Sequence, residues 1–99
     1  MLVSTITDER LRALADPVRW RIVQLLAREQ LCTCHLQDEL RAKQTLVSHH
    51  LRALRDAGLV ETEPCGRFTY YRLAPGALDG LADDLRALAG AAVVPKRPC

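Results

Sequence analysis

Aliphatic side chains recur every three or four residues along most of this chain, as they do on the buried faces of amphipathic helices. Among its 99 residues 48% are hydrophobic but only 4% are aromatic, so aliphatic side chains must supply nearly all of the core. A chain of this length builds one compact core and little else. The sequence therefore predicts one mainly helical domain, and its small size favours further burial between two copies.

Residues typical of helix starts and ends divide the chain up to Gly58 into four predicted helices. The first covers residues 8–15 with Thr7 as its N-cap, the second begins at Pro17 with Asp16 as its N-cap, the third covers residues 34–41, and the fourth covers residues 45–57. Gly58 ends the fourth helix, since glycine readily adopts the left-handed conformation found there. A tight turn over residues 42–44 joins the last two helices into a helix-turn-helix.

The second predicted helix is apolar on two sides. One side carries Val18, Ile22, Leu25 and Leu26, and the other carries Trp20, Val23 and Ala27. A helix with two apolar sides is usually packed by neighbours on both. We therefore expect this helix to lie at the centre of the domain.

The hydrophobic period changes after Gly58 and then returns to the helical one. Residues 59–63 and 67–73 are expected to form two strands of a hairpin, with the turn at residues 64–66. A last helix follows, with an apolar stripe that is longer than so small a core can cover: Leu78, Leu81, Ala82, Leu85, Leu88, Ala89 and Ala92. We expect residues 1–92 to form the domain, part of the stripe to pack against the same helix of a second copy, and residues 93–99 to form a tail.

Hydrogen-bonding and basic side chains gather on one side of the fourth predicted helix. Successive helical residues lie about 100° apart, which places Val47, Leu51 and Leu54 on the opposite side. The chain has a net charge of only +2, but residues 41–55 contain no Asp or Glu and four basic residues: Arg41, Lys43, Arg52 and Arg55. A helix of this kind can enter the major groove of DNA.

The expected contacts with DNA follow from the side chains on that face. Lys43, Arg52 and Arg55 would neutralise phosphates, and Gln44, Ser48 and His49 would meet base edges beside Thr45. Arg67, at the tip of the hairpin, could reach a neighbouring minor groove or phosphate. His50 lies nearer the apolar side, so we expect it to pack rather than to contact a base.

Cys32 and Cys34 stand two residues apart, where the second helix has ended and the third begins. Within a regular helix such residues point about 200° apart, but at a helix start or in extended backbone they can converge. Thiolates bind soft or borderline ions. We predict a metal or metalloid site at this pair; the alternative is two small buried side chains without a ligand.

Two thiols do not complete such a site, and three residues are candidates for the third ligand. Cys99 ends the tail, which has few constraints and could reach the pair of its own or a partner chain. Cys65 is expected near the DNA end of the domain, and His35 stands beside the pair. We favour Cys99, with Cys65 as the alternative.

Four cysteines in so short a chain could also form two disulfides in a secreted protein. Residues 1–15 lack the basic and apolar segments of a signal peptide, and no stretch approaches the roughly 20 apolar residues of a membrane span. We therefore expect a cytoplasmic protein with free thiols and no membrane partner. No phosphate-binding loop or acidic pair is present, and Cys34-His35 lacks a clear base and orienting partner, so we expect no enzyme and no organic cofactor.

Three segments and part of the hairpin resemble the ArsR/SmtB family of metal-sensing winged-helix repressors. The segments are residues 16–23, 29–36 and 47–60 (DPVRWRIV, EQLCTCHL and VSHHLRALRDAGLV), with YYRL at residues 70–73. The resemblance covers about residues 8–90. It implies a winged helix-turn-helix that forms a homodimer through its terminal helices, binds operator DNA without ligand, and releases it when a metal or metalloid ion binds.

Within this family Cys32 and Cys34 resemble the arsenic and antimony site of the branch with two or three cysteines at the start of the first motif helix. Gln37 stands where that branch has a third cysteine. The zinc-sensing branch has a histidine and acidic residues in the last helix, which here has no histidine among its polar residues: Asp79, Asp83, Asp84 and Arg86. The resemblance implies a repressor that responds to As(III), and Sb(III) is a second effector to consider.

Two alternatives share the same thiols. A Cd(II) or Pb(II) sensor would use Cys32 and Cys34 with a ligand from elsewhere in the chain. A redox switch would oxidise these cysteines, or one in the tail, and change the affinity for DNA without a metal.

Overall fold

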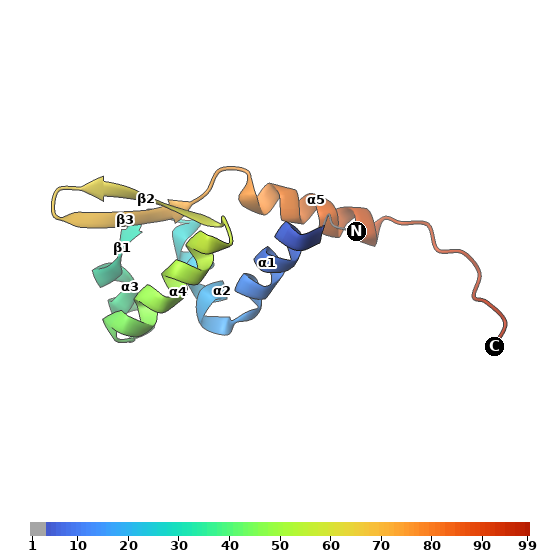
Figure 1. The fold of residues 1–99 in the computed structure, drawn as a ribbon, viewed down its shortest axis with the longest axis horizontal. Coiled ribbons are helices and arrows are strands. Elements are labelled where there is room, and N and C mark those ends of the chain that lie inside the picture. Colours follow the sequence, from blue (N-terminus) through green and yellow to red (C-terminus); the bar gives the residue numbers. More distant parts are fainter. Residues whose placement is uncertain (1–3) are drawn as a thin grey trace.

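The computed structural model describes residues 4–99, which form five helices and a three-stranded antiparallel sheet (Figure 1). In chain order the elements are α1 (Ser4–Ala15), α2 (Pro17–Leu26), β1 (Leu31–Cys32), α3 (Thr33–Leu40), α4 (Gln44–Asp56), β2 (Val60–Cys65), β3 (Phe68–Leu73) and α5 (Ala77–Ala89). The strand order in the sheet is β1-β3-β2. The predicted mainly helical fold, with a helix-turn-helix at α3–α4 and a wing at β2–β3, is confirmed.

The core joins the helix-turn-helix to the helix before it and to the start of the wing. Ile22, Leu36, Leu54 and Leu59 are fully buried and come from α2, α3, α4 and the segment between α4 and β2. Because these side chains are close-packed, the amphipathic faces of three helices and the start of the wing are held in one arrangement.

Local signals fix the start of α2 and the end of α4. The Asp16 side chain accepts hydrogen bonds from the backbone N–H groups of Val18 (2.8 Å) and Arg19 (3.2 Å), so it caps α2 as predicted. Gly58 has φ +77°, the left-handed conformation expected after α4. The N-cap prediction at Thr7 is wrong, because α1 begins at Ser4 and Thr7 lies inside it. Threonine is tolerated at an interior helical position at a modest cost in helix propensity.

The prediction that α2 is covered on both sides is wrong for two residues. Ile22, Val23, Leu25 and Leu26 are buried, but Ala27 is exposed and 48% of the Trp20 surface is accessible. The helices and strands of one chain therefore cover the side of α2 that carries Ile22 and, on the other side, cover Val23 but leave Trp20 and Ala27 exposed.

The sheet differs from the predicted hairpin in two ways. Strand β1 was not predicted; its two residues pair with β3, with Leu31 opposite Tyr71 and Cys32 opposite Tyr70. The turn is formed by residues 66–67, not 64–66. Gly66 has φ +63° and begins a two-residue hairpin turn, while Pro64 lies in β2, an edge strand that tolerates its missing N–H group.

The first and last helices lie side by side (Figure 1), where the Arg10 guanidinium donates to the Ala77 carbonyl at 3.4 Å. Ala77 and Leu81 of α5 are buried, whereas Leu85 and Leu88 are 51% and 75% exposed. The helix ends at Ala89, before Ala92, with Gly90 as its C-cap. Residues 91–99 form no helix or strand.

Within residues 4–99 no helix is long and apolar enough to span a membrane.

Candidate functional site

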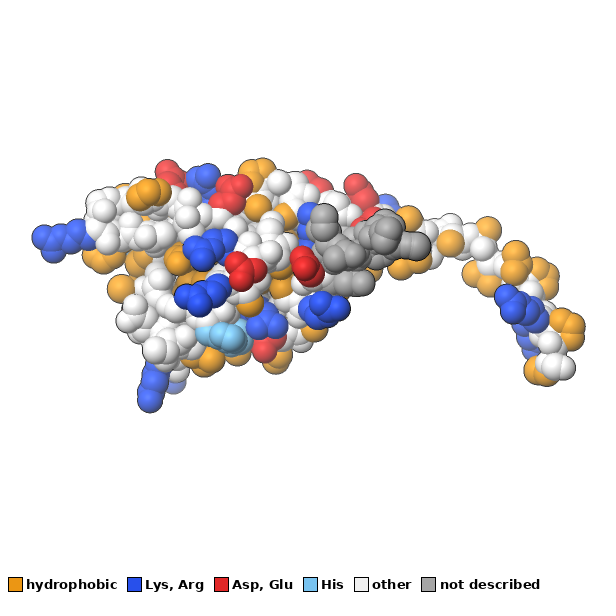
Figure 2. Space-filling view, viewed as in Figure 1, with side chains coloured by type: hydrophobic (Ala, Val, Ile, Leu, Met, Phe, Trp, Pro, Cys, Tyr) orange, Lys and Arg blue, Asp and Glu red, His pale blue; other side chains and the backbone are white. Residues whose placement is uncertain are grey.

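Helix α4 separates its buried and exposed residues as the sequence predicts. Val47, Leu51 and Leu54 are buried, while the opposite face is exposed and carries Gln44, Thr45, Ser48, His49, Arg52 and Arg55. Lys43, the N-cap residue, is exposed too. Figure 2 shows Lys and Arg side chains over α4, at the turn before it and at the tip of the wing, all on one face of the molecule. Helix α4 therefore has an exposed side, surrounded by basic side chains, that can enter a DNA groove.

A polar hollow of about 220 Å³ connects α4 with the wing. It is lined by Ser48, Leu51, Arg52 and Arg55 from α4 and by Tyr71 from β3. Arg52 and Arg55 thus lie between the helix and the wing, where the guanidinium groups can meet a phosphate that approaches either element.

The wing presents one basic residue at its tip and holds a second in ion pairs. Arg67 follows Gly66 in the turn and is exposed. Arg72 instead contacts two carboxylates of the neighbouring strand, with Nη2 3.1 Å from Glu61 and Nη1 2.7 Å from Glu63. Arg72 is therefore held along the sheet, and Arg67 is the wing arginine at the tip.

His50 packs inside the domain, as predicted. Its side chain is 7% exposed, and its Nδ1 atom lies 3.2 Å from Nη1 of Arg19 in α2. Its neighbour His49 is exposed on the basic face. The two adjacent histidines therefore have different environments.

The two cysteines of the predicted thiol pair also differ in environment. Cys32 is buried at the end of β1, and Cys34 is exposed in the first turn of α3. The imidazole of His35 accepts the backbone N–H of Cys32 at Nδ1 (3.1 Å), and the Cys32 Sγ atom lies 3.3 Å from the same nitrogen. Cys32 and His35 form a capping box at the start of α3.

This capping role of His35 was missed, although the sequence holds a signal for it. In a capping box the N-cap residue and the residue three positions later exchange hydrogen bonds with each other's backbone. Cys32 and His35 have this spacing, but with residue types that seldom form the box. The His35 ring also lies near Tyr70 of β3, with ring centroids 5.9 Å apart.

Of the three candidates for the third ligand, His35 lies beside Cys32, and the structure brings neither Cys65 nor Cys99 into contact with the thiol pair. Cys65 lies in β2 and Cys99 at the chain end, and both are exposed and free. Among residues 4–99 no three His, Cys, Asp or Glu side chains come together in a way that could hold a metal ion. The assignment of Cys99, Cys65 or His35 as third ligand stays a prediction.

Known proteins resemble this chain in both sequence and structure. The profile described as "Bacterial regulatory protein, arsR family" matches residues 16–62. The HTH-type transcriptional repressor SmtB of Mycobacterium tuberculosis is 48% identical over 82 residues, which are 83% of this chain and 61% of that protein. The arsenical resistance operon repressor of Staphylococcus aureus is 33% identical over 78 residues, 79% of this chain and 75% of that protein.

The match spans 47% of the length of the Synechocystis SmtB homolog and 61% of the length of the Mycobacterium tuberculosis SmtB. Among solved structures, the homodimeric winged helix-turn-helix DNA-binding domain of a possible ArsR-family transcriptional regulator from Mycobacterium bovis superposes with a TM-score of 0.72. It is 28% identical, and the match covers 85% of this chain and 78% of that one. With a profile match across α2–α4, relatives in sequence and the same fold, the chain belongs to the ArsR family of bacterial regulatory proteins.

Proposed function

We propose that this protein is a homodimeric, As(III)-responsive transcriptional repressor that acts on operator DNA in the cytoplasm. The observation that carries the proposal is the place of the Cys32/Cys34 pair, at the junction between the wing sheet and the helix-turn-helix. The Staphylococcus aureus relative is an arsenical resistance operon repressor, which supports a metalloid effector. Sb(III), Cd(II) and Pb(II) are thiophilic ions to be compared with As(III) in the test below.

The proposed DNA contacts use the exposed face of α4 and the tip of the wing. Gln44, Thr45, Ser48 and His49 would read base edges, and Lys43, Arg52, Arg55 and Arg67 would contact phosphates. The exposed Leu85 and Leu88 of α5, with Leu11 of α1, supply the apolar surface through which two copies would associate.

Binding of one ion by both thiols requires a change at the start of α3. Cys32 is buried against His35, while Cys34 is exposed two residues further along the first turn. The Cys32 Sγ atom lies 3.3 Å from Nδ1 of His35, so joint coordination with Cys34 needs this contact, and with it the cap at the start of α3, to break. The ion would therefore favour a conformer in which the start of α3 is rearranged.

Two connections carry this change to the proposed DNA-binding elements. Through α3, the change would shift the helix-turn-helix, since Leu36 packs in the same core as Leu51 and Leu54 of α4. Through β1, it would reach the wing, because Cys32 pairs with Tyr70, two residues after Phe68 at the start of β3. The coupling between thiols and DNA is thus short-range, with one packed core and one strand pair as its path.

The test uses a DNA duplex selected by the reduced protein from a pool of random sequences. The wild-type protein is expected to bind this duplex and to release it when arsenite is added. Cys32→Ser and Cys34→Ser are expected to bind it with unchanged affinity but to stay bound at arsenite concentrations that release the wild type. Fluorescence anisotropy of the labelled duplex measures both steps.

Thr33→Ala, between the two cysteines, is the matched control and should respond as the wild type does. Antimonite, Cd(II), Pb(II) and peroxide are added in parallel to identify the effector. Normal arsenite release from either cysteine variant would refute the proposed site. Release by peroxide alone would instead establish the redox switch.

A further inference from the structure

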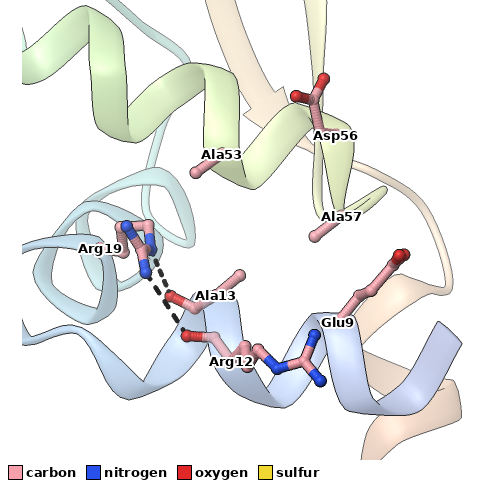
Figure 3. A pocket seen from close by; sticks show the side chains of 7 residues that line it. All are labelled: Glu9, Arg12, Ala13, Arg19, Ala53, Asp56 and Ala57. Atoms are coloured by element: carbon pink, nitrogen blue, oxygen red, sulfur yellow. Dashed lines mark hydrogen bonds between the residues drawn. The ribbon is translucent and has the colours of Figure 1, made fainter. Parts of the chain in front are cut away.

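The Arg19 side chain connects three helices that would otherwise meet through few polar contacts. From α2 its Nε atom donates to the Ala13 carbonyl at 2.7 Å, and its Nη2 atom donates to the Arg12 carbonyl at 3.5 Å. Its Nη1 atom lies 3.2 Å from Nδ1 of His50 in α4. Figure 3 shows the guanidinium group directed at the last turn of α1.

The last turn of α1 needs such a partner. The last four carbonyl groups of a helix accept no hydrogen bond from within that helix. Because α1 ends at Ala15, the carbonyls of Arg12 and Ala13 belong to this group. A cavity of about 260 Å³ separates α1 from α4 beside Arg19, and its walls include the small side chains Ala13, Ala53 and Ala57 (Figure 3). Apolar packing between the two helices is thin there, so the polar bridge through Arg19 matters for their relative position.

The position of Arg19 itself is fixed by the start of α2. The Asp16 carboxylate accepts the backbone N–H of Arg19 as part of the N-cap. This hydrogen bond, the largest cause, holds the pKa of Asp16 below its usual value. The cap therefore stays charged well below neutral pH and keeps the first turn of α2 in place.

Hydrogen-bond chemistry assigns the charge state of His50. A guanidinium group has only donors, so Nδ1 of His50 must accept and the ring proton must sit on Nε2. Burial, the largest cause, lowers the pKa of His50; Asp16 opposes this, while Arg19 and His49 add to it. Asp16 acts from the N-cap of α2, Arg19 from α2 itself and His49 from α4. At neutral pH the ring is neutral and the bridge can form.

We propose that Arg19 and neutral His50 form a positioning bridge that holds α4 at a fixed place relative to α1, and that protonation of His50 breaks it. A protonated ring offers no acceptor to Arg19 and places a second cation beside the first. The intact bridge connects α1, which is proposed to take part in dimerisation, with α4, which is proposed to read the DNA. The inference rests on the proposed function only for the roles of these two helices.

The expected pH dependence has a definite sign. Because the folded protein lowers the pKa of His50 below its ordinary value of 6.5, the bridge is intact above pH 6.5 and is lost only as the pH falls through this lowered pKa. Asp16 titrates below its usual 3.8, so its cap is lost only at much lower pH. Measurements from pH 7.5 down to 5.5 therefore leave the Asp16 cap in place.

The first measurement needs no DNA. Ring ¹⁵N spectra of the full chain are expected to show His50 as the neutral tautomer with its proton on Nε2 at pH 7.5. Arg19→Lys should change this signal, because one ammonium group cannot contact the α1 carbonyls and the ring in the same geometry. Arg21→Lys, on the same helix, is the control. A His50 ring with its proton on Nδ1, or one that is charged at pH 7.5, would overturn the proposal.

The second measurement uses a His49→Gln parent, so that His50 is the one histidine of α4, and follows its affinity for a duplex selected by this parent itself. Affinity is expected to fall by about tenfold as the pH is lowered from 7.5 through the lowered pKa of His50, a size usual for the coupling between two linked sites. Adding His50→Asn, which keeps an acceptor near Nδ1 but has no titrating proton, should preserve affinity and remove the pH dependence. His50→Leu should bind weakly throughout this pH range.

These outcomes separate the bridge from the proposed function. A pH dependence that persists with His50→Asn, or its absence in the His49→Gln parent, would refute the bridge. Failure of the wild type to select any duplex would refute the proposed function instead, while the ring spectra would still decide on the bridge.

Discussion

A variant with Arg52→Ala and Arg55→Ala is expected to bind the selected DNA duplex on the order of 100-fold more weakly than the wild type, since charge-assisted contacts with phosphate are lost. Both arginines are exposed on α4 and line the hollow shared with Tyr71 of the wing. In a dimer four such contacts would disappear. The slope of log affinity against log salt should then become shallower by about 3 to 4.

The control for this variant removes the same charge elsewhere. Lys96→Ala with Arg97→Ala also deletes two basic residues, but from the segment after α5. Its affinity and salt slope should equal those of the wild type. If the α4 variant keeps a wild-type salt slope, α4 does not contact the phosphates and the assigned DNA face is wrong.

Leu85→Asp with Leu88→Asp is expected to convert the protein to a monomer and to abolish tight binding to the selected duplex. Both side chains are largely exposed on α5, so the change should leave the fold of one chain intact. Two carboxylates in an apolar interface would be buried without partners, which is strongly unfavourable. Loss of the dimer removes the linked second half-site, and affinity should fall by about 10²- to 10⁴-fold.

Sedimentation and circular dichroism test this outcome together. Val93→Asp with Val94→Asp, two exposed apolar residues beyond α5, is the matched control and should remain dimeric. A Leu85/Leu88 variant that sediments as the wild type does would place the association surface elsewhere. A variant without helical signal would instead show that these residues support the fold of the single chain.

The helices and the DNA face could be predicted because both depend on local patterns. Apolar spacing and the cap residues Asp16 and Gly58 define α2 and α4, and the same spacing separates Val47 from Arg52 on the helix surface. Such signals act within a few residues, so one sequence is enough to read them.

Features that depend on distant contacts were missed. Strand β1 has only two residues, Leu31 and Cys32, and exists because β3 pairs with it some 40 positions later in the chain. The bridge from Arg19 to His50 likewise joins residues 31 positions apart. Neither has a periodic signature. The burial of Cys32 follows from β1, so the unequal environments of the two thiols could not be predicted either.

The proposed arsenic site is tested most directly by counting the As(III) bound per chain. Reduced wild-type protein and the four single Cys→Ser variants are dialysed against arsenite, and bound arsenic is measured. The proposed site predicts one ion per wild-type chain, none in Cys32→Ser and Cys34→Ser, and weaker binding in Cys99→Ser with little change in Cys65→Ser. Binding of one ion by Cys32→Ser or Cys34→Ser, or of none by the wild type, would contradict it.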